Sequence, residues 1–178
     1  IDMACWDALG RAAGLPICRL LGGVCRTEIE LCGCMGLKPP AESVETCRLY
    51  VEEFGFCYVK TKAGRDPDED RAIARALMEA WGDRIRLRPD ANSAYTPDRA
   101  EPLLREMKAL GIFAYEDPCS SDHLAEMARF RREIGIRIAN NMGVRRADSA
   151  LRIVTAGAAD LLMPDFSAAG SILAVKEV

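Results

Sequence analysis

Apolar and polar positions along the chain follow two alternating patterns. Short runs rich in apolar and β-branched residues are followed by longer segments whose apolar residues recur every three or four positions. These spacings are typical of buried strands and amphipathic helices. The expected strands are 28–34, 56–62, 85–90, 112–116, 136–140 and 160–163. The expected helices are 41–54, 67–81, 97–109, 121–134 and 146–156, with another beginning near residue 171.

Residues 1–23 precede this repeat and predict a helix pair or a broken helix. Trp6 and Leu9 belong to a run of apolar residues at helical spacing, Pro16 interrupts the run, and a pair of glycines closes it. We expect this part to be the lead-in helical segment of a single domain that covers residues 1–178.

The joints between the expected elements are short. Pro67 and Pro97 follow potential helix-capping residues, and glycines such as Gly111 and Gly135 end helices just before the next strand. Consecutive strand-helix units with such joints imply a parallel sheet with right-handed crossovers. No glycine-rich phosphate loop follows any strand, which disfavours a nucleotide-binding doubly wound sheet. We therefore predict an α/β fold, a partial TIM-type (β/α) barrel with about six βα units.

Composition and charge are those of an ordinary globular domain. Hydrophobic residues make up 49%, charged residues 29%, and the formal net charge is -3. No continuous basic face is present to bind a phosphate backbone, so nucleic acid is not an expected partner. No apolar stretch is long enough to span a bilayer and no signal layout is evident, so we expect a cytoplasmic protein without membrane contact.

Eight cysteines are present, but their spacing does not predict a disulfide framework or a zinc site. Only Cys32 and Cys34 lie close together, no CxxC pair occurs, and His123 is the single histidine. We expect reduced cysteines packed as small hydrophobic residues. His123 is expected on a helix surface or at a helix cap.

Two lysines end the second expected strand. Lys60 and Lys62 are two residues apart and therefore point to the same face. Their mutual repulsion, together with desolvation, is expected to lower a lysine pKa towards the range of a general base. The pair taken alone fits better with a solvated strand end, in which both lysines reach water.

Carboxylates end the next two strands, at the end of a barrel where active sites are built. Asp90 and Glu116 provide hard oxygen ligands suited to Mg²⁺, although each of them alone could cap a helix. Asn140 or Asn141 is a candidate third ligand. Asp165 follows the sixth strand, and without a partner it is more typical of a helix cap.

Four strand-end motifs and the opening segment resemble the mandelate racemase branch of the enolase superfamily. The motifs are VKTK (59–62), PDAN (89–92), YEDP (115–118) and MPD (163–165). The resemblance implies that Mg²⁺ is bound by Asp90, Glu116 and a residue on the fifth strand. It implies that Lys62 is the proton-abstracting base and that Lys60 tunes Lys62 or contacts the substrate carboxylate. Asn92 would lie close to the substrate or the metal.

Two features are similar to glucarate dehydratases within that branch. Asn141 directly precedes Met142, as in the Asn-Met pair of those enzymes, and is therefore the better match for the third ligand. Asp165 matches the aspartate of a His-Asp dyad, whose histidine lies on a seventh strand. The chain begins at Ile1 and ends at Val178 within helical patterns, so we expect an incomplete barrel domain, without the family's N-terminal capping domain and last strands.

The expected activity is removal of the α-proton of a carboxylate through an enediolate. The resemblance favours dehydration of an acid sugar to a 2-keto-3-deoxy acid, so the expected partner is a small-molecule carboxylate. Racemisation or epimerisation of a 2-hydroxy acid is the alternative within the same class. A non-catalytic barrel fragment is the alternative from another class. Related enzymes are commonly multimers, which leaves a homo-oligomer open.

Overall fold

The computed structural model describes residues 1–178 and contains one sheet of six parallel strands, ordered along the sheet as they are along the chain. The strands are β1 (Cys32–Met35), β2 (Tyr58–Lys62), β3 (Arg86–Asp90), β4 (Tyr115–Glu116), β5 (Ile138–Asn140) and β6 (Leu161–Leu162). Sequential parallel strands joined through helices are the topology of a β/α barrel. The predicted α/β fold and its partial-barrel architecture are confirmed.

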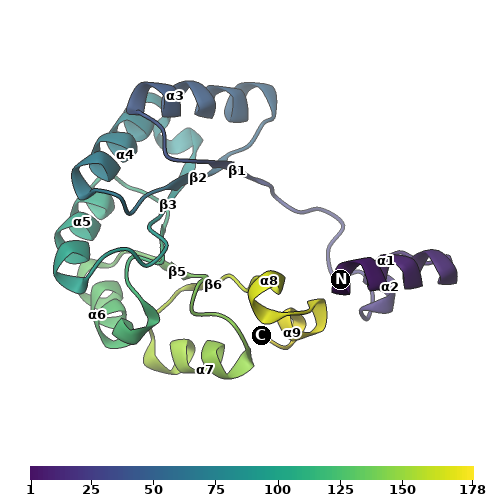
Figure 1. Ribbon diagram of the computed structural model, residues 1–178. Coiled ribbons are helices and arrows are strands. Elements are labelled where there is room, and N and C mark those ends of the chain that lie inside the picture. Colours follow the sequence, from purple (N-terminus) through teal and green to yellow (C-terminus); the bar gives the residue numbers. More distant parts are fainter.

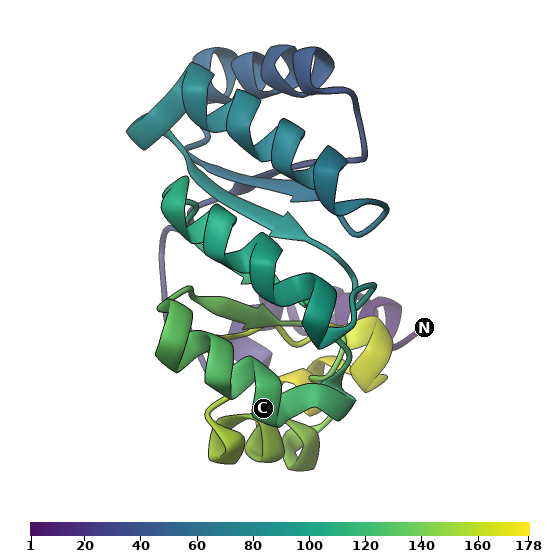
Figure 2. The ribbon, with the colours of Figure 1, turned by 90° about the vertical axis from the view of Figure 1, so that its left-hand side faces the viewer.

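Helices cover the outer side of the curved sheet (Figure 1). They are α3 (Pro40–Arg48) with the π-helical turn η1 (Leu49–Glu53), α4 (Pro67–Trp81) with η2 (Gly82–Arg84), α5 (Pro97–Ala109), η3 (Ser121–His123) with α6 (Leu124–Ile134), and α7 (Ala147–Ala156). Figure 2 looks onto this helical layer, in which successive helices lie side by side. None of the helices combines the length and the apolar character needed to cross a bilayer.

The core lies between the sheet and the helices. On β2, Val59 and Thr61 are buried towards the helices, whereas the lysines between and after them remain half-buried on the inner face. Leu77 of α4 and Leu103 of α5 are fully buried members of a cluster of 26 buried apolar residues. Replacing a core leucine of this kind by alanine typically costs about 2 to 5 kcal/mol. This packing fixes the strand ends that carry the polar residues.

The lead-in segment is a broken helix, as predicted, and lies apart from the helical layer. It consists of α1 (Asp2–Ala13) and α2 (Ile17–Leu20), which lie near α8 (Phe166–Ala169) and α9 (Ile172–Glu177) in Figure 1. Asp2 Oδ2 accepts a hydrogen bond from Ile172 N at 2.8 Å. Lys176 Nζ donates to the Leu21 carbonyl at 2.5 Å. Two short contacts therefore connect the ends of the chain.

Several local predictions were wrong. The first strand begins at Cys32 rather than at residue 28, because its only partner is β2, whose pairing begins at Tyr58. Pro67 and Pro97 begin helices as predicted, but neither of the residues before them caps its helix through a side chain. Helix α8 was not anticipated.

The packing predicted for the cysteines also fails for most of them. All eight are unpaired, and only Cys47 and Cys119 are buried. Five are exposed, and these are Cys5, Cys18, Cys25, Cys34 and Cys57. Cys5 and Cys18 lie on the lead-in segment and Cys25 lies in the connection that follows it, all outside the main core. Cys34 lies on a strand at the edge of the sheet.

Candidate functional site

One row of side chains crosses the carboxyl ends of three neighbouring strands. Lys62 of β2 is the register partner of Asp90 of β3, and Asp90 is the register partner of Glu116 of β4. Residues in one row of a parallel sheet point to the same face. The row therefore follows from strand pairing, and it lies on the inner face of the sheet because the alternate residues of β2 point to the helices.

Five of the predicted site residues contact one another there. Lys60 Nζ lies 2.7 Å from Asp90 Oδ2 and 3.0 Å from Glu116 Oε1. Lys62 Nζ lies 2.7 Å from Asp90 Oδ2 and donates a hydrogen bond of 2.7 Å to Asn92 Oδ1. Asp90 and Glu116 are buried almost completely. The structure thus brings the two lysines, the two carboxylates and Asn92 into one polar cluster.

The charges of this cluster act on its pKa values. Burial raises the pKa of Asp90, but Lys60, Lys62 and the Asn92 N–H lower it by more, so it lies below its usual value. Burial lowers the pKa of Lys60, but Asp90 and Glu116 raise it by more. The expected lowering of the lysine pKa is therefore wrong for Lys60, because carboxylates on two other strands outweigh the effect of burial.

Arg88 is a member of the site that the sequence did not reveal. It lies on β3 two residues before Asp90, on the same face, and is 6% exposed. Arg88 Nε lies 3.1 Å from Glu116 Oε2, an ion pair whose angles do not make a hydrogen bond, so this buried oxygen has no hydrogen-bond donor. The only sequence signal for Arg88 was its place two residues before Asp90 on the same strand, which puts both side chains on one face.

Asp117 was also missed, although it is part of the YEDP motif. Its φ of 42° is unusual for a residue with a side chain. The carboxylate accepts hydrogen bonds from Asn141 N at 3.1 Å and from Met142 N at 2.9 Å. Burial raises the pKa of Asp117 to about 6, although these two amides lower it. Asp117 therefore connects the loop after β4 to the loop after β5.

The two asparagines after β5 have different surroundings. Asn140 is fully buried, and its Oδ1 accepts a hydrogen bond from Gly143 N at 3.1 Å. Asn141 Nδ2 donates to the Met163 carbonyl at 2.7 Å, and its Oδ1 accepts no hydrogen bond from the protein. Glu116 is the register partner of Ala139, so Ala139 and the residue two positions after it, Asn141, lie on the same face as the carboxylates. Its position on this face and its available Oδ1 favour Asn141 as a ligand.

Asp165 and His123 do not contact this cluster. Asp165 Oδ1 accepts hydrogen bonds from the amide and the hydroxyl of Ser167 and so caps α8. These bonds lower the pKa of Asp165. His123 ends η3 and lies 3.8 Å from Glu126 at the surface, as expected for a residue at a helix cap.

The cluster of oxygen atoms fits a divalent cation. Ligand atoms of Asp90, Glu116 and Asp117 lie within 4.8 Å of one another. Both oxygens of Asp117 already accept amide hydrogen bonds, whereas Glu116 Oε2 is buried without any donor. Carboxylate oxygens are hard ligands of the kind that Mg²⁺ takes in proteins.

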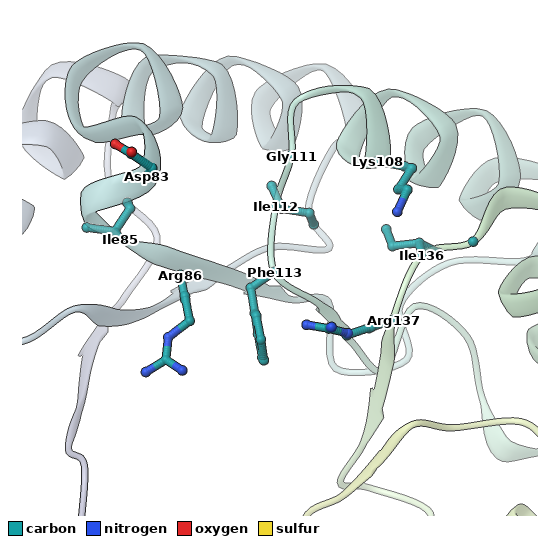
Figure 3. A pocket seen from close by; sticks show the side chains of 10 residues that line it. Asp83, Ile85, Arg86, Lys108, Gly111, Ile112, Phe113, Ile136 and Arg137 are labelled. Carbon is teal, nitrogen blue, oxygen red and sulfur yellow. The ribbon is translucent and has the colours of Figure 1, made fainter.

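The largest of the described cavities lies elsewhere. It has a volume of about 500 Å³ and is found at the amino ends of β3, β4 and β5. Figure 3 shows Lys108, Arg86, Phe113 and Arg137 around it. Active sites of β/α barrels lie at the opposite, carboxyl end of the strands. The largest cavity therefore does not coincide with the carboxyl ends of the strands, where the polar cluster lies.

Comparison with known proteins agrees with this geometry. Residues 42–178, which include the strands from β2 to β6 and their polar ends, match the family model described as enolase C-terminal domain-like. The chain belongs to this family. Its β1 and lead-in segment lie outside the matched residues.

Relatives within the enolase superfamily match nearly the whole chain. Arabinonate dehydratase from Saccharolobus solfataricus is 29% identical over 100% of the chain and 48% of that enzyme. Hydrophobic dipeptide epimerase from Enterococcus faecalis is 31% identical over 91% of the chain and 45% of that enzyme. The chain thus spans about half the length of the curated relatives it matches, and these relatives catalyse different reactions.

A solved enolase superfamily structure has the same fold over nearly the whole chain. It is an enolase from Bradyrhizobium complexed with magnesium and mandelic acid, with a TM-score of 0.87 and 30% identity. The similarity covers 99% of this chain and 49% of that protein. Because the relatives include dehydratases and epimerases, membership of the superfamily alone does not single out the glucarate dehydratase-like branch.

Proposed function

We propose that the protein catalyses Mg²⁺-dependent removal of the α-proton of a carboxylate substrate, with Lys62 as the base. The observation that carries this proposal is the row formed by Lys62, Asp90 and Glu116 at the carboxyl ends of barrel strands. The Lys62 amine lies beside buried Asp90, and Asp90 is the register partner of buried Glu116. A base next to an electrophilic centre is the arrangement that such proton abstraction requires.

Asp90, Glu116 and Asn141 are the residues that would hold the ion. Two carboxylates and one amide leave more positive charge on the ion than three carboxylates do. Bound Mg²⁺ would attract the substrate carboxylate and stabilise the negative charge that develops when the α-proton leaves. Arg88 Nε lies beside Glu116 Oε2, so Arg88 would hold the Glu116 carboxylate in place.

The remaining polar groups orient the base and the substrate. Lys62 is proposed to accept the α-proton through its side-chain nitrogen, and Asn92 Oδ1, 2.7 Å away, fixes the direction of that group. Lys60 remains charged between Asp90 and Glu116, which suits it to contact the substrate carboxylate or the enediolate. Asn92 Nδ2 is in addition a donor for a substrate hydroxyl.

Within this chemistry, we propose dehydration of an acid sugar to a 2-keto-3-deoxy acid. The Asn141-Met142 pair, similar to that of glucarate dehydratases, and the similarity to arabinonate dehydratase support this reaction. Asp165 is proposed to orient a histidine that acts with Lys62 and is not among the residues of this chain. Its present contacts, both to Ser167, leave its Oδ2 available for such a partner.

Racemisation or epimerisation is the second candidate. It is supported by the similarity to the dipeptide epimerase and to the enolase complexed with mandelic acid. In that reaction the proton returns to the other face of the α-carbon and no water is lost. The two candidates share the removal of the α-proton and differ only in the second step.

A product assay with the full-length gene product separates these candidates. The protein is incubated with Mg²⁺ and a panel of aldonates, aldarates and other 2-hydroxy acids in D₂O, and products are followed by NMR. Release of a 2-keto acid supports dehydration, whereas deuterium at the α-carbon of unchanged or epimerised substrate supports racemisation. If neither product forms with any aldonate, aldarate or 2-hydroxy acid, the proposed activity is wrong and a non-catalytic barrel is left.

A further inference from the structure

Behind the polar cluster lies a buried carboxylate that the proposed reaction does not use. Asp70 of α4 is 3% exposed and forms no ion pair. Its Oδ2 accepts three hydrogen bonds, from Gly64 N at 3.0 Å, from the Tyr95 hydroxyl at 2.5 Å and from the Tyr115 hydroxyl at 3.3 Å. A buried carboxylate without a cation is costly, so its retention needs a reason.

The three donors come from three successive βα units. Gly64 lies in the loop after β2, two residues after Lys62, and Tyr95 lies in the loop after β3, three residues after Asn92. Tyr115 belongs to β4 itself and directly precedes Glu116. One oxygen of Asp70 therefore holds together the segments that carry the base, its hydrogen-bond partner and a proposed metal ligand.

The loops after β2 and β3 also touch each other at this point. Ala63 N donates to the Asp90 carbonyl at 2.8 Å. A Cβ on Gly64 would lie 2.5 Å from the Ala91 carbonyl oxygen, and the φ of Gly64 is +97°, so only glycine allows this approach. The backbone that directly follows Lys62 is thus closely apposed to the loop that carries Asn92.

We propose that Asp70 is a positioning residue that determines where the Lys62 amine lies relative to Asp90 and Asn92. Asp70 contacts neither the base nor the carboxylates, and it acts through the Gly64 amide and the Tyr95 hydroxyl. This inference rests on the proposed function of Lys62. A base displaced by about 1 Å can lose roughly 100-fold in rate, whereas Asp90 and Glu116 lie at the ends of paired strands, in register with each other.

The first test compares Asp70→Asn with Asp70→Ala in the full-length gene product. Asparagine keeps one carbonyl oxygen for the three donors, whereas alanine removes it. We expect Asp70→Ala to lower kcat about 10- to 100-fold with little change in KM, and Asp70→Asn to restore kcat to within about threefold of the wild type. Mg²⁺ affinity, measured by calorimetry, should change less than about threefold in both variants.

A matched pair of tyrosine variants keeps the test decisive if Asp70→Ala does not fold. Tyr95→Phe and Tyr115→Phe each remove one hydroxyl that donates to the same oxygen. Tyr115 lies in strand β4, where its amide bonds to the Arg137 carbonyl at 2.9 Å, whereas Tyr95 lies between β3 and α5, where an isolated bridge to Cys119 and a longer bond of 3.3 Å to the Pro118 carbonyl hold its backbone. We expect Tyr95→Phe to lower kcat about tenfold and Tyr115→Phe to lower it less than about threefold.

Three results would overturn the inference. The first is an unchanged kcat in folded Asp70→Ala. The second is an equal loss of kcat in the two tyrosine variants. The third is a lower kcat together with a higher KM and a weaker Mg²⁺ affinity, none of which Asp70→Asn restores. Failure of the proposed function is seen separately, as absence of α-proton exchange in the wild type. In that case amide hydrogen exchange tests whether Asp70 holds the loops after β2 and β3 together. Asp70→Ala should raise the exchange rate in 62–65 and 92–95 but not in α6.

Discussion

Lys62 and Asp90 are register partners on adjacent parallel strands, and Lys62 Nζ lies 2.7 Å from Asp90 Oδ2. Lys60 reaches the same oxygen at 2.7 Å. One buried oxygen thus lies between two ammonium groups, and it belongs to a carboxylate that we propose as a metal ligand. Lysine and metal therefore compete for the same negative charge.

This competition predicts the effect of removing one ammonium group. Lys60→Met leaves Asp90 and Glu116 with fewer cations in the metal-free protein, so we expect a lower unfolding temperature without Mg²⁺. We expect Mg²⁺ affinity to rise roughly tenfold, equivalent to about 1.4 kcal/mol, and the stabilisation by Mg²⁺ to increase accordingly. Titration calorimetry and thermal unfolding with and without Mg²⁺ measure both effects.

The matched control is Lys108→Met, which removes an exposed lysine at the other end of the strands. This variant should leave Mg²⁺ affinity unchanged. A weaker affinity for Mg²⁺ in Lys60→Met would mean that Lys60 helps to assemble the ligands rather than competing with the ion.

The two asparagines after β5 should respond in opposite ways. Asn141→Ala removes an available amide oxygen and is expected to weaken Mg²⁺ binding about tenfold with little effect on folding. Asn140→Ala removes the buried acceptor of the Gly143 amide, which should cost about 1 to 3 kcal/mol of unfolding free energy and leave Mg²⁺ affinity of the folded protein intact. Calorimetry and urea unfolding of the same two variants are the measurements, and the reverse pattern would assign the ligand to Asn140.

Asp160, before β6, predicts a pH dependence of stability. Burial raises the pKa of Asp160, but Arg131 and the Ile138 amide lower it by more. A lowered folded-state pKa means that the unfolded state binds the proton more readily than the folded state does. The Asp160 carboxylate therefore stabilises the fold fully above its unfolded-state pKa of about 3.9. This stabilisation is lost as pH falls through the folded-state pKa.

Replacing this carboxylate should therefore flatten the acid side of the stability curve. We expect wild type to lose more unfolding free energy than Asp160→Asn when pH falls from about 5 to about 2.5. Urea unfolding at a series of pH values measures the difference. Equal slopes for the two proteins would exclude a stabilising role of the Asp160 carboxylate.

Much of the fold was predictable because local signals repeat along the chain. Apolar runs, proline starts and glycine stops indicated the strand-helix order, and parallel strands with short joints permit few arrangements. The row of Lys62, Asp90 and Glu116 was predictable for the same reason, because polar residues at the ends of parallel strands meet at one edge. Strand β1 was placed less well, since its length depends on the pairing of β2 rather than on its own residues.

The electrostatics of the site were not predictable in the same way. The sequence shows the two lysines side by side, but Glu116 is separated from Lys60 by 56 positions and becomes its partner only through the register of three strands. Arg88, Asp117 and Asp70 were missed because their partners also lie on other strands or loops. A single residue carries no local signal of the contacts that it makes with distant strands and loops.

The most direct test of the proposed function is α-proton exchange catalysed by Lys62. The full-length gene product is incubated with Mg²⁺ and a carboxylate substrate in D₂O, and deuterium uptake is followed for wild type, Lys62→Ala and the control Lys108→Ala. We predict that Lys62→Ala lowers the exchange rate about 100-fold or more, while Lys108→Ala exchanges at the wild-type rate. Exchange at the wild-type rate in Lys62→Ala would contradict the assignment of Lys62 as the base.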